Sequence, residues 1–306
     1  MARGGAKTRR RQKQLAGRRI TYRIHPLTYD EYRGWDSPHR PDFATYLRFG
    51  GLPGLAGVDD ERRKEQLLQD YMATYIFKDV KGLIREENIR AFNQLIYILA
   101  QNQGQVVEVS SLSRELGLGM ATVSGYLSVL DQTYVNFLVP SYHTNLANEL
   151  KKSKKTYLYD LGVRNSILKD FRPAAERQDR GAIHESFVFL SLLPHLTPSM
   201  EIRFWRTKRK EEVDFVLVKD RQPFPIEVKS HLERPSIAEG LAAFIRRYPT
   251  TSDSFTVSDR AFEPVRDGET THHFLAFEDL SPILKRVSGT RVGRDPGDAS
   301  SSPGDV

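Results

Sequence analysis

EEVDFVLVKDRQPFPIEVKS, residues 211–230, decides the fold of the C-terminal half of this chain. Two runs rich in Val, Phe, Leu and Ile flank a polar turn, which is the pattern of a β-hairpin. Asp214 lies in the first run, and Glu227 and Lys229 lie in the second. Side chains alternate between the two faces of a strand, so Glu227 and Lys229 share one face and Val228 points to the other.

Pairing of the two runs would bring Asp214, Glu227 and Lys229 together, with Asp214 on the same face as Val216. Two carboxylates repel one another unless a cation lies between them, and Mg²⁺ prefers such oxygen ligands. A lysine beside the ion can orient a water and stabilise negative charge on a phosphate. The hairpin therefore predicts a Mg²⁺ site at Asp214 and Glu227, suited to phosphodiester hydrolysis with help from Lys229. A structural set of ion pairs on an exposed sheet face is the alternative.

The segments around the hairpin indicate an alternating arrangement of helices and strands. Residues 181–193 form an apolar helix that carries Glu185, which is either an auxiliary acid of the site or a solvated helix residue. Strands are expected at 201–207, 211–218, 225–230, 254–258 and 272–277, and a helix at 236–248. This order predicts an α/β (α+β) fold with a mixed sheet. Arg206 and Lys208 are either ordinary surface charges or phosphate contacts.

The preceding region is helical. Apolar residues recur at helical spacing over residues 60–80 and 86–101. Residues 106–140 then predict a short strand, two helices joined by a glycine turn, and a strand, with a return strand at 154–160. The order resembles a winged helix-turn-helix. A packing module between larger domains is the alternative.

The second of these two helices, starting near Thr122, is a poor reader of DNA bases because it carries no Arg or Lys. Its polar side chains are those of Thr122, Ser124, Tyr126 and Ser128. Contacts to backbone phosphates are instead expected from the wing lysines, which are Lys151, Lys152, Lys154 and Lys155.

Composition limits the class of protein. The chain contains no cysteine, which excludes disulfides and thiolate metal sites. No apolar run approaches the ~20 residues that cross a bilayer, so we expect a cytoplasmic protein without a membrane partner. Residues 1–19 contain eight Lys or Arg and no acid, and the rest of the chain is nearly neutral.

The spacing of the acidic residues resembles a known nuclease fold. An aspartate, twelve intervening residues and then Glu-Val-Lys, after a helix that carries a glutamate, is similar to the PD-(D/E)xK pattern. The resemblance implies that Asp214 is the motif aspartate, Glu227 its second acid and Lys229 its lysine. Glu185 would be the acid of the first core helix.

A longer series of motifs resembles the C-terminal part of prokaryotic AAA+-like ATPases that carry the DUF4143 domain. The motifs are LAGR at 15–18, HPLTYDEY at 25–32, YLRFGGLPGL at 46–55, DYMATYIFKDV at 70–80, YLYDLGVRN at 157–165, GAIHESFV, FWRTK, EVDFV and IEVK. The resemblance implies a winged-helix domain followed by a restriction-endonuclease-like domain. Such ATPases begin with a P-loop domain, but this sequence contains no GxxxxGK[ST]. We therefore expect a truncated or frameshifted relative, without an ATP site or ATPase activity.

The predicted organisation has four parts. They are a basic arm that is the remnant of an ATPase domain (1–19), a helical region with the winged helix-turn-helix (20–160), a DUF4143 nuclease-like domain (161–286) and a disordered tail (287–306). Two functions remain open. One is a DNA-associated protein with a Mg²⁺-dependent nuclease-like site, and the other is a non-catalytic scaffold that binds DNA or a protein partner and normally serves an attached ATPase.

Overall fold

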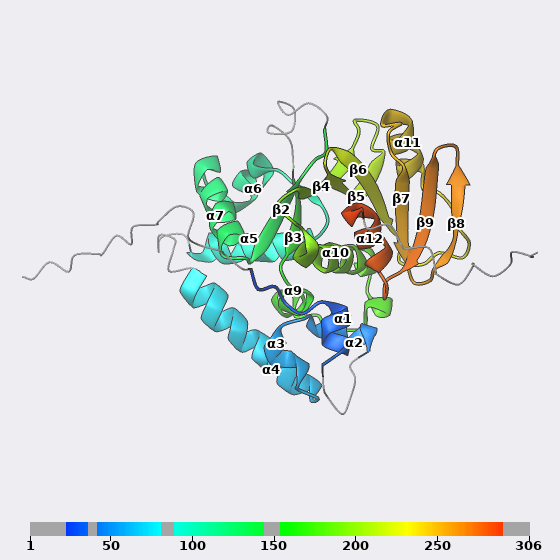
Figure 1. The fold of residues 1–306 in the computed structure, drawn as a ribbon. Coiled ribbons are helices and arrows are strands. Elements are labelled where there is room, and N and C mark those ends of the chain that lie inside the picture. The colour runs from blue at the N-terminus through cyan, green and yellow to red at the C-terminus, as the bar shows by residue number, and fades with distance from the viewer. Residues whose placement is uncertain (1–22, 36–41, 81–88, 144–153, 290–306) are drawn as a thin grey trace, which may run out of the picture.

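The computed structural model describes residues 23–35, 42–80, 89–143 and 154–289. The basic arm and most of the predicted tail lie outside these ranges, as do the wing residues Lys151 and Lys152. Figure 1 shows helices and a small sheet in the N-terminal half and a larger sheet in the C-terminal half, in agreement with the predicted α+β class.

Short helices come first in the described part of the chain, and longer ones follow. The helices are α1 (Tyr29–Arg33), α2 (Phe43–Phe49), α3 (Pro53–Ala56), α4 (Glu61–Tyr71), a π-helical continuation (Met72–Val80) and α5 (Ile89–Gln101). Thr28 and Glu31 form a reciprocal capping box at the start of α1, and Asp42 caps α2, so polar side chains satisfy backbone donors at both helix starts. The apolar face of α5 is buried, as the spacing predicted.

A compact unit follows α5. It consists of β1 (Val106–Val107), α6 (Val109–Leu116), α7 (Met120–Gln132), β2 (Asn136–Pro140) and β3 (Lys154–Leu158). Gly117 ends α6 in the left-handed conformation, which glycine adopts without strain. The strands pair antiparallel in the order β1-β3-β2, so β3 is the central strand. The order of helices and strands agrees with the predicted elements, and the winged helix-turn-helix itself stays a prediction.

The larger sheet has six strands in the order β4-β5-β6-β7-β9-β8. They are β4 (Met200–Arg206), β5 (Glu212–Lys219), β6 (Gln222–Val228), β7 (Asp253–Ser258), β8 (Phe262–Asp267) and β9 (Thr270–Ala276). The first three pair antiparallel, whereas β6, β7 and β9 are parallel, so the sheet is mixed as predicted. The sequence did not predict β8, which is an edge strand whose side chains are mostly exposed.

Helices cover both faces of this sheet. On one face α10 (Arg180–Leu192) and α12 (Ser281–Ser288) pack in a cluster with Phe215, Leu217 and Ile226. On the other face α11 (Glu239–Arg247) packs its Leu241 and Phe244 against the strands. The disordered tail was predicted to begin at residue 287, but α12 continues to Ser288.

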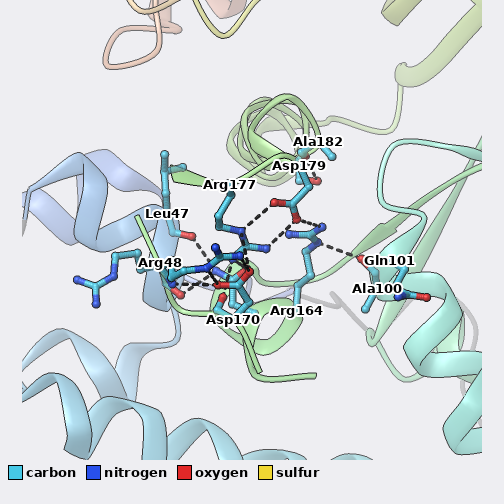
Figure 2. A network of polar contacts seen from close by, with 12 residues as sticks. Leu47, Arg48, Ala100, Gln101, Arg164, Asp170, Arg177, Asp179 and Ala182 are labelled. Carbon is cyan, nitrogen blue, oxygen red and sulfur yellow. Dashed lines mark hydrogen bonds and ion pairs between the residues drawn. The ribbon is translucent and has the colours of Figure 1, made fainter. Parts of the chain in front are cut away.

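Two buried arginines, Arg164 within α9 (Leu161–Leu168) and Arg177 after it, join several helices (Figure 2). Arg164 donates to the Asp179 carboxylate at 2.6 Å and to the Ala100 carbonyl in α5 at 3.1 Å. Arg177 donates to the same carboxylate at 2.7 Å. Burial opposes ionisation of Asp179, but the two guanidinium groups outweigh it and lower its pKa to about 2. Asp179 therefore fixes α9 and α5 against the start of α10.

Candidate functional site

The β5–β6 hairpin brings the predicted site residues to one end of the sheet. Its turn is made by Asp220 and Arg221, whose φ angles of 50° and 66° suit a tight two-residue hairpin turn. Backbone pairing extends only to Phe215 and Ile226. Beyond that pair the backbone pairing ends. There the Asp214 side chain connects the two strands, because its Oδ2 accepts the backbone N–H of Val228 at 2.9 Å.

A β-bulge sets the direction of Asp214. Arg203 pairs with Val216 and Trp205 pairs with Val213, so Phe204 alone lies opposite both Asp214 and Phe215. Val213 and Val216 consequently pack on the same side, against α11. The Asp214 carboxylate instead reaches side chains from α10 and β3. The prediction that Asp214 shares a face with Val216 is wrong, because strict alternation does not hold across a bulge.

Glu227 and Lys229 share a face, as predicted. Lys229 Nζ lies 2.7 Å from Glu227 Oε1, and Val228 packs in the cluster on the opposite side. Glu227 Oε2 is buried and has no hydrogen-bond partner among the described residues. Burial and the nearby negative charge of Asp214 raise the pKa of Glu227 to about 7, although Lys229 opposes the shift.

Glu185 approaches Lys155 and Asp214 from the middle of α10. Its Oε1 accepts hydrogen bonds from Lys155 Nζ at 2.9 Å and from the Tyr157 hydroxyl at 2.5 Å. Its other oxygen lies against Gly104, where an added Cβ would be only 2.8 Å away. Burial, followed by repulsion from Asp214, raises the pKa of Glu185 to about 8. Glu185 is therefore not a solvated helix residue.

Lys155 is the cation of this cluster, and the sequence analysis assigned it a different role. Its Nζ lies 2.9 Å from Glu185 Oε1, 2.7 Å from Glu212 Oε1 and 3.4 Å from Asp214 Oδ1. Only 1% of the residue is exposed, because β3 is the central strand of its sheet. The prediction that Lys155 contacts DNA phosphates is therefore wrong, whereas its neighbour Lys154 is exposed. The apolar TYLY sequence that follows was the signal that this strand is buried.

The arrangement leaves few carboxylate oxygens available to a metal. Both oxygens of Asp214 already accept a hydrogen bond, one from Lys155 and one from Val228, and Lys229 occupies one oxygen of Glu227. Within the described ranges, no group of three or more His, Cys, Asp or Glu residues is placed to hold a metal ion. As arranged, the carboxylates of Asp214 and Glu227 leave one oxygen without a hydrogen-bond partner, Glu227 Oε2, and Lys155 supplies positive charge beside Asp214. The Mg²⁺ site remains a prediction.

The exposed face of α7, the second helix of the predicted helix-turn-helix, carries no basic groups. The exposed face of α7 carries Met120, Ser124 and Ser128. Tyr126, which was predicted to be a polar reader, is buried and packs edge-on against Phe92 at 5.3 Å. Reading of DNA bases by α7 thus has little chemical support.

Comparisons with known proteins match both halves of the chain to domains of unknown function. Residues 180–274 match DUF4143, and residues 40–174 match DUF8612. An uncharacterized protein of Mycobacterium tuberculosis is 26% identical over 194 residues, covering 63% of this chain and 44% of that protein. Uncharacterized proteins of Haemophilus influenzae and Methanocaldococcus jannaschii are 27% and 24% identical, over 58% and 66% of this chain and 46% and 48% of theirs.

The chain thus spans about half the length of the curated relatives that it matches. No helix in the described ranges is long and apolar enough to cross a membrane.

Proposed function

We propose that this chain is a DNA-associated module whose nuclease-like acid cluster, formed by Glu185, Glu212 and Asp214, encloses the Lys155 ammonium group and does not hydrolyse DNA in this form. The order α10, β4, β5, β6, α11 and β7 supports the nuclease-like assignment, because Asp214 lies on the second strand, Glu227 lies on the third, and Lys229 follows directly after the third. The order from β1 to β3 supports the winged helix-turn-helix assignment in the same way.

The observation that carries the non-catalytic proposal is the position of Lys155. A buried ammonium group that contacts Glu185, Glu212 and Asp214 supplies a positive charge beside these three carboxyl groups within the protein. Phosphodiester hydrolysis through Asp214 would need a cation that contacts both Asp214 and the phosphate. Lys155 lies beside Asp214 but is buried on a central strand, so a phosphate in solvent does not reach it. The cluster then holds β3 against α10 and β5.

The experiment is a plasmid-nicking assay with the full chain in Mg²⁺ and in Mn²⁺, together with DNA binding in a chelator. We expect no nicking and metal-independent binding. Metal-dependent nicking by the wild-type protein that is lost in both Asp214→Ala and Lys229→Ala would overturn the non-catalytic proposal. Absence of DNA binding would overturn the DNA association and favour a protein partner.

Metal-dependent phosphodiester hydrolysis is the second candidate, and Glu227 is the observation that favours it. Its unpartnered, buried Oε2 and its raised pKa are typical of a carboxylate poised for a ligand or a proton. Lys229 lies beside it and is about half exposed. This candidate requires Lys155 to withdraw from Asp214, and the nicking assay decides between the two.

We also propose, from the resemblance to AAA+-like proteins alone, that the module serves an ATPase domain. The genomic bases upstream of the first codon test this proposal. A reading frame there that encodes GxxxxGK[ST] would support it, and unrelated sequence would count against it.

A further inference from the structure

A basic groove lies at the end of the sheet, next to Glu212 of the acid cluster. It runs between the β4–β5 turn and the last turn of α11 and has a volume of about 630 Å³. We define its cationic lining, the groove cations, by five residues: Arg206, Lys208, Arg209, Arg246 and Arg247. All five side chains are exposed. The acid that lines the groove with them is Glu211.

Close packing fixes the shape of this groove. Gly240 allows the start of α11 to touch β5, because a Cβ at this position would overlap the carbonyl oxygen of Glu212. Farther along α11, Phe244 packs edge-on against the buried Trp205 at 5.3 Å and against Tyr248 at 4.6 Å. The walls are thus held before any ligand arrives, which lowers the entropic cost of binding.

Most of the groove cations form no ion pair with a carboxylate of the described residues. Glu211 accepts from the Thr207 hydroxyl at 2.9 Å, and Arg206 lies 3.4 Å from Glu212. Lys208, Arg209, Arg246 and Arg247 have no ion-pair partner within the described part of the chain. Arg246 and Arg247 also interact favourably with the α11 dipole, but that effect does not account for Lys208 and Arg209 on the facing wall.

We infer that this groove binds the phosphate backbone of DNA. The assignment rests on the proposed DNA association and names the surface responsible for it. Four guanidinium groups and one ammonium group around an open groove suit a row of phosphates, because guanidinium groups bind phosphate oxygens through paired N–H donors. No base-reading surface is required, in agreement with the neutral exposed face of α7.

The test is fluorescence anisotropy of the full chain with a DNA duplex of about 20 base pairs, measured across a range of salt concentrations. One variant combines Arg246→Ala with Arg247→Ala, and a second combines Lys208→Ala with Arg209→Ala on the facing wall. The matched control combines Arg62→Ala with Arg63→Ala on α4, at the opposite end of the molecule (Figure 1). Both control arginines are exposed, as the groove cations are. The control removes two positive charges, the same number as each groove variant.

We expect each groove variant to bind at least about tenfold more weakly, with a salt slope reduced by about 2, because two phosphate contacts are lost. The control should bind as the wild type does. If the wild type binds and all three variants bind equally well, the groove assignment is wrong and the proposed DNA association stands. If the wild type does not bind, both fail. Competition by polyglutamate as strong as that by unlabelled duplex would assign the groove to an acidic polypeptide instead.

Discussion

Lys155 and Lys154 are neighbours on one strand with opposite environments. Lys154 is exposed, whereas Lys155 is closed off and contacts three carboxylates. The sequence predicted the β5–β6 pairing and the contact between Glu227 and Lys229, because hairpin pairing and alternation are local, whereas the shared site with Asp214 stays a prediction. It could not predict Lys155, since that residue reaches the cluster from a separate sheet.

Replacing Lys155 with Met tests its role as the cation of the cluster. The variant keeps the length of the side chain but leaves Glu185, Glu212 and Asp214 without their cation, so we expect the free energy of unfolding to fall by about 3–5 kcal/mol. Lys154→Met is the matched control and should change it by less than about 0.5 kcal/mol. Urea unfolding at neutral pH measures both. Equal effects of the two substitutions would show that Lys155 is not a buried partner.

Glu185 predicts a specific dependence of stability on pH. Its folded-state pKa of about 8 lies above its ordinary value of 4.5, so the stability that its protonated form contributes is complete below pH 4.5 and is lost as the pH rises through 8. Glu185→Gln cannot ionise. Its free energy of unfolding should therefore fall less than that of the wild type between pH 5 and pH 9, by about 4 kcal/mol. Parallel pH profiles for the two proteins would refute the raised pKa.

At the scale of elements, the sequence predicted the β5–β6 hairpin and the mixed sheet, because their signals are alternation and turn residues within short segments. The bulge at Asp214 and Phe215 was not predictable, since it is defined by the register with β4. Strand β8 was missed for a related reason. FEPVRD contains a proline and two acids, which an exposed edge strand tolerates and a central strand does not.

The contact between α11 and β5 gives a prediction about Gly240. Gly240→Ala would force the helix away from the Glu212 carbonyl, so we expect a loss of about 1–3 kcal/mol in the free energy of unfolding and weaker binding to duplex DNA. Gly125→Ala in α7 is the control, because no atom lies within 4 Å of its added Cβ. It should stabilise the protein by about 0.5–1 kcal/mol. Thermal unfolding compares them, and a neutral Gly240→Ala would refute the close contact.

For the whole molecule, the α+β class followed from the order of predicted elements, whereas the packing between its halves did not. One hydrophobic cluster contains Tyr29 and Tyr46 from the N-terminal helices together with Phe187 and Phe215 from the C-terminal half. The boundary predicted between residues 160 and 161 stays a prediction, but Asp160 itself is buried and accepts a hydrogen bond from the Gly51 amide. Contacts at such sequence separations leave no local signature.

The shared cluster predicts a single cooperative unfolding transition. The chain has two tryptophans, Trp35 in the N-terminal half and Trp205 in the C-terminal half. In a Trp35→Phe variant the fluorescence reports on Trp205 alone, and circular dichroism reports on all helices. The two urea transitions should coincide, because neither half buries its apolar residues without the other. Two separate midpoints would show that the halves unfold independently.

The central claim is that Lys155, and not a metal, is the cation of the acid cluster. The most direct measurement is the anomalous scattering from a crystal of the wild-type protein soaked in millimolar MnCl₂. The account predicts Lys155 Nζ in contact with Glu185, Glu212 and Asp214, with no manganese peak among them. A manganese ion bound by Asp214 and Glu227, with Lys155 displaced, would contradict it.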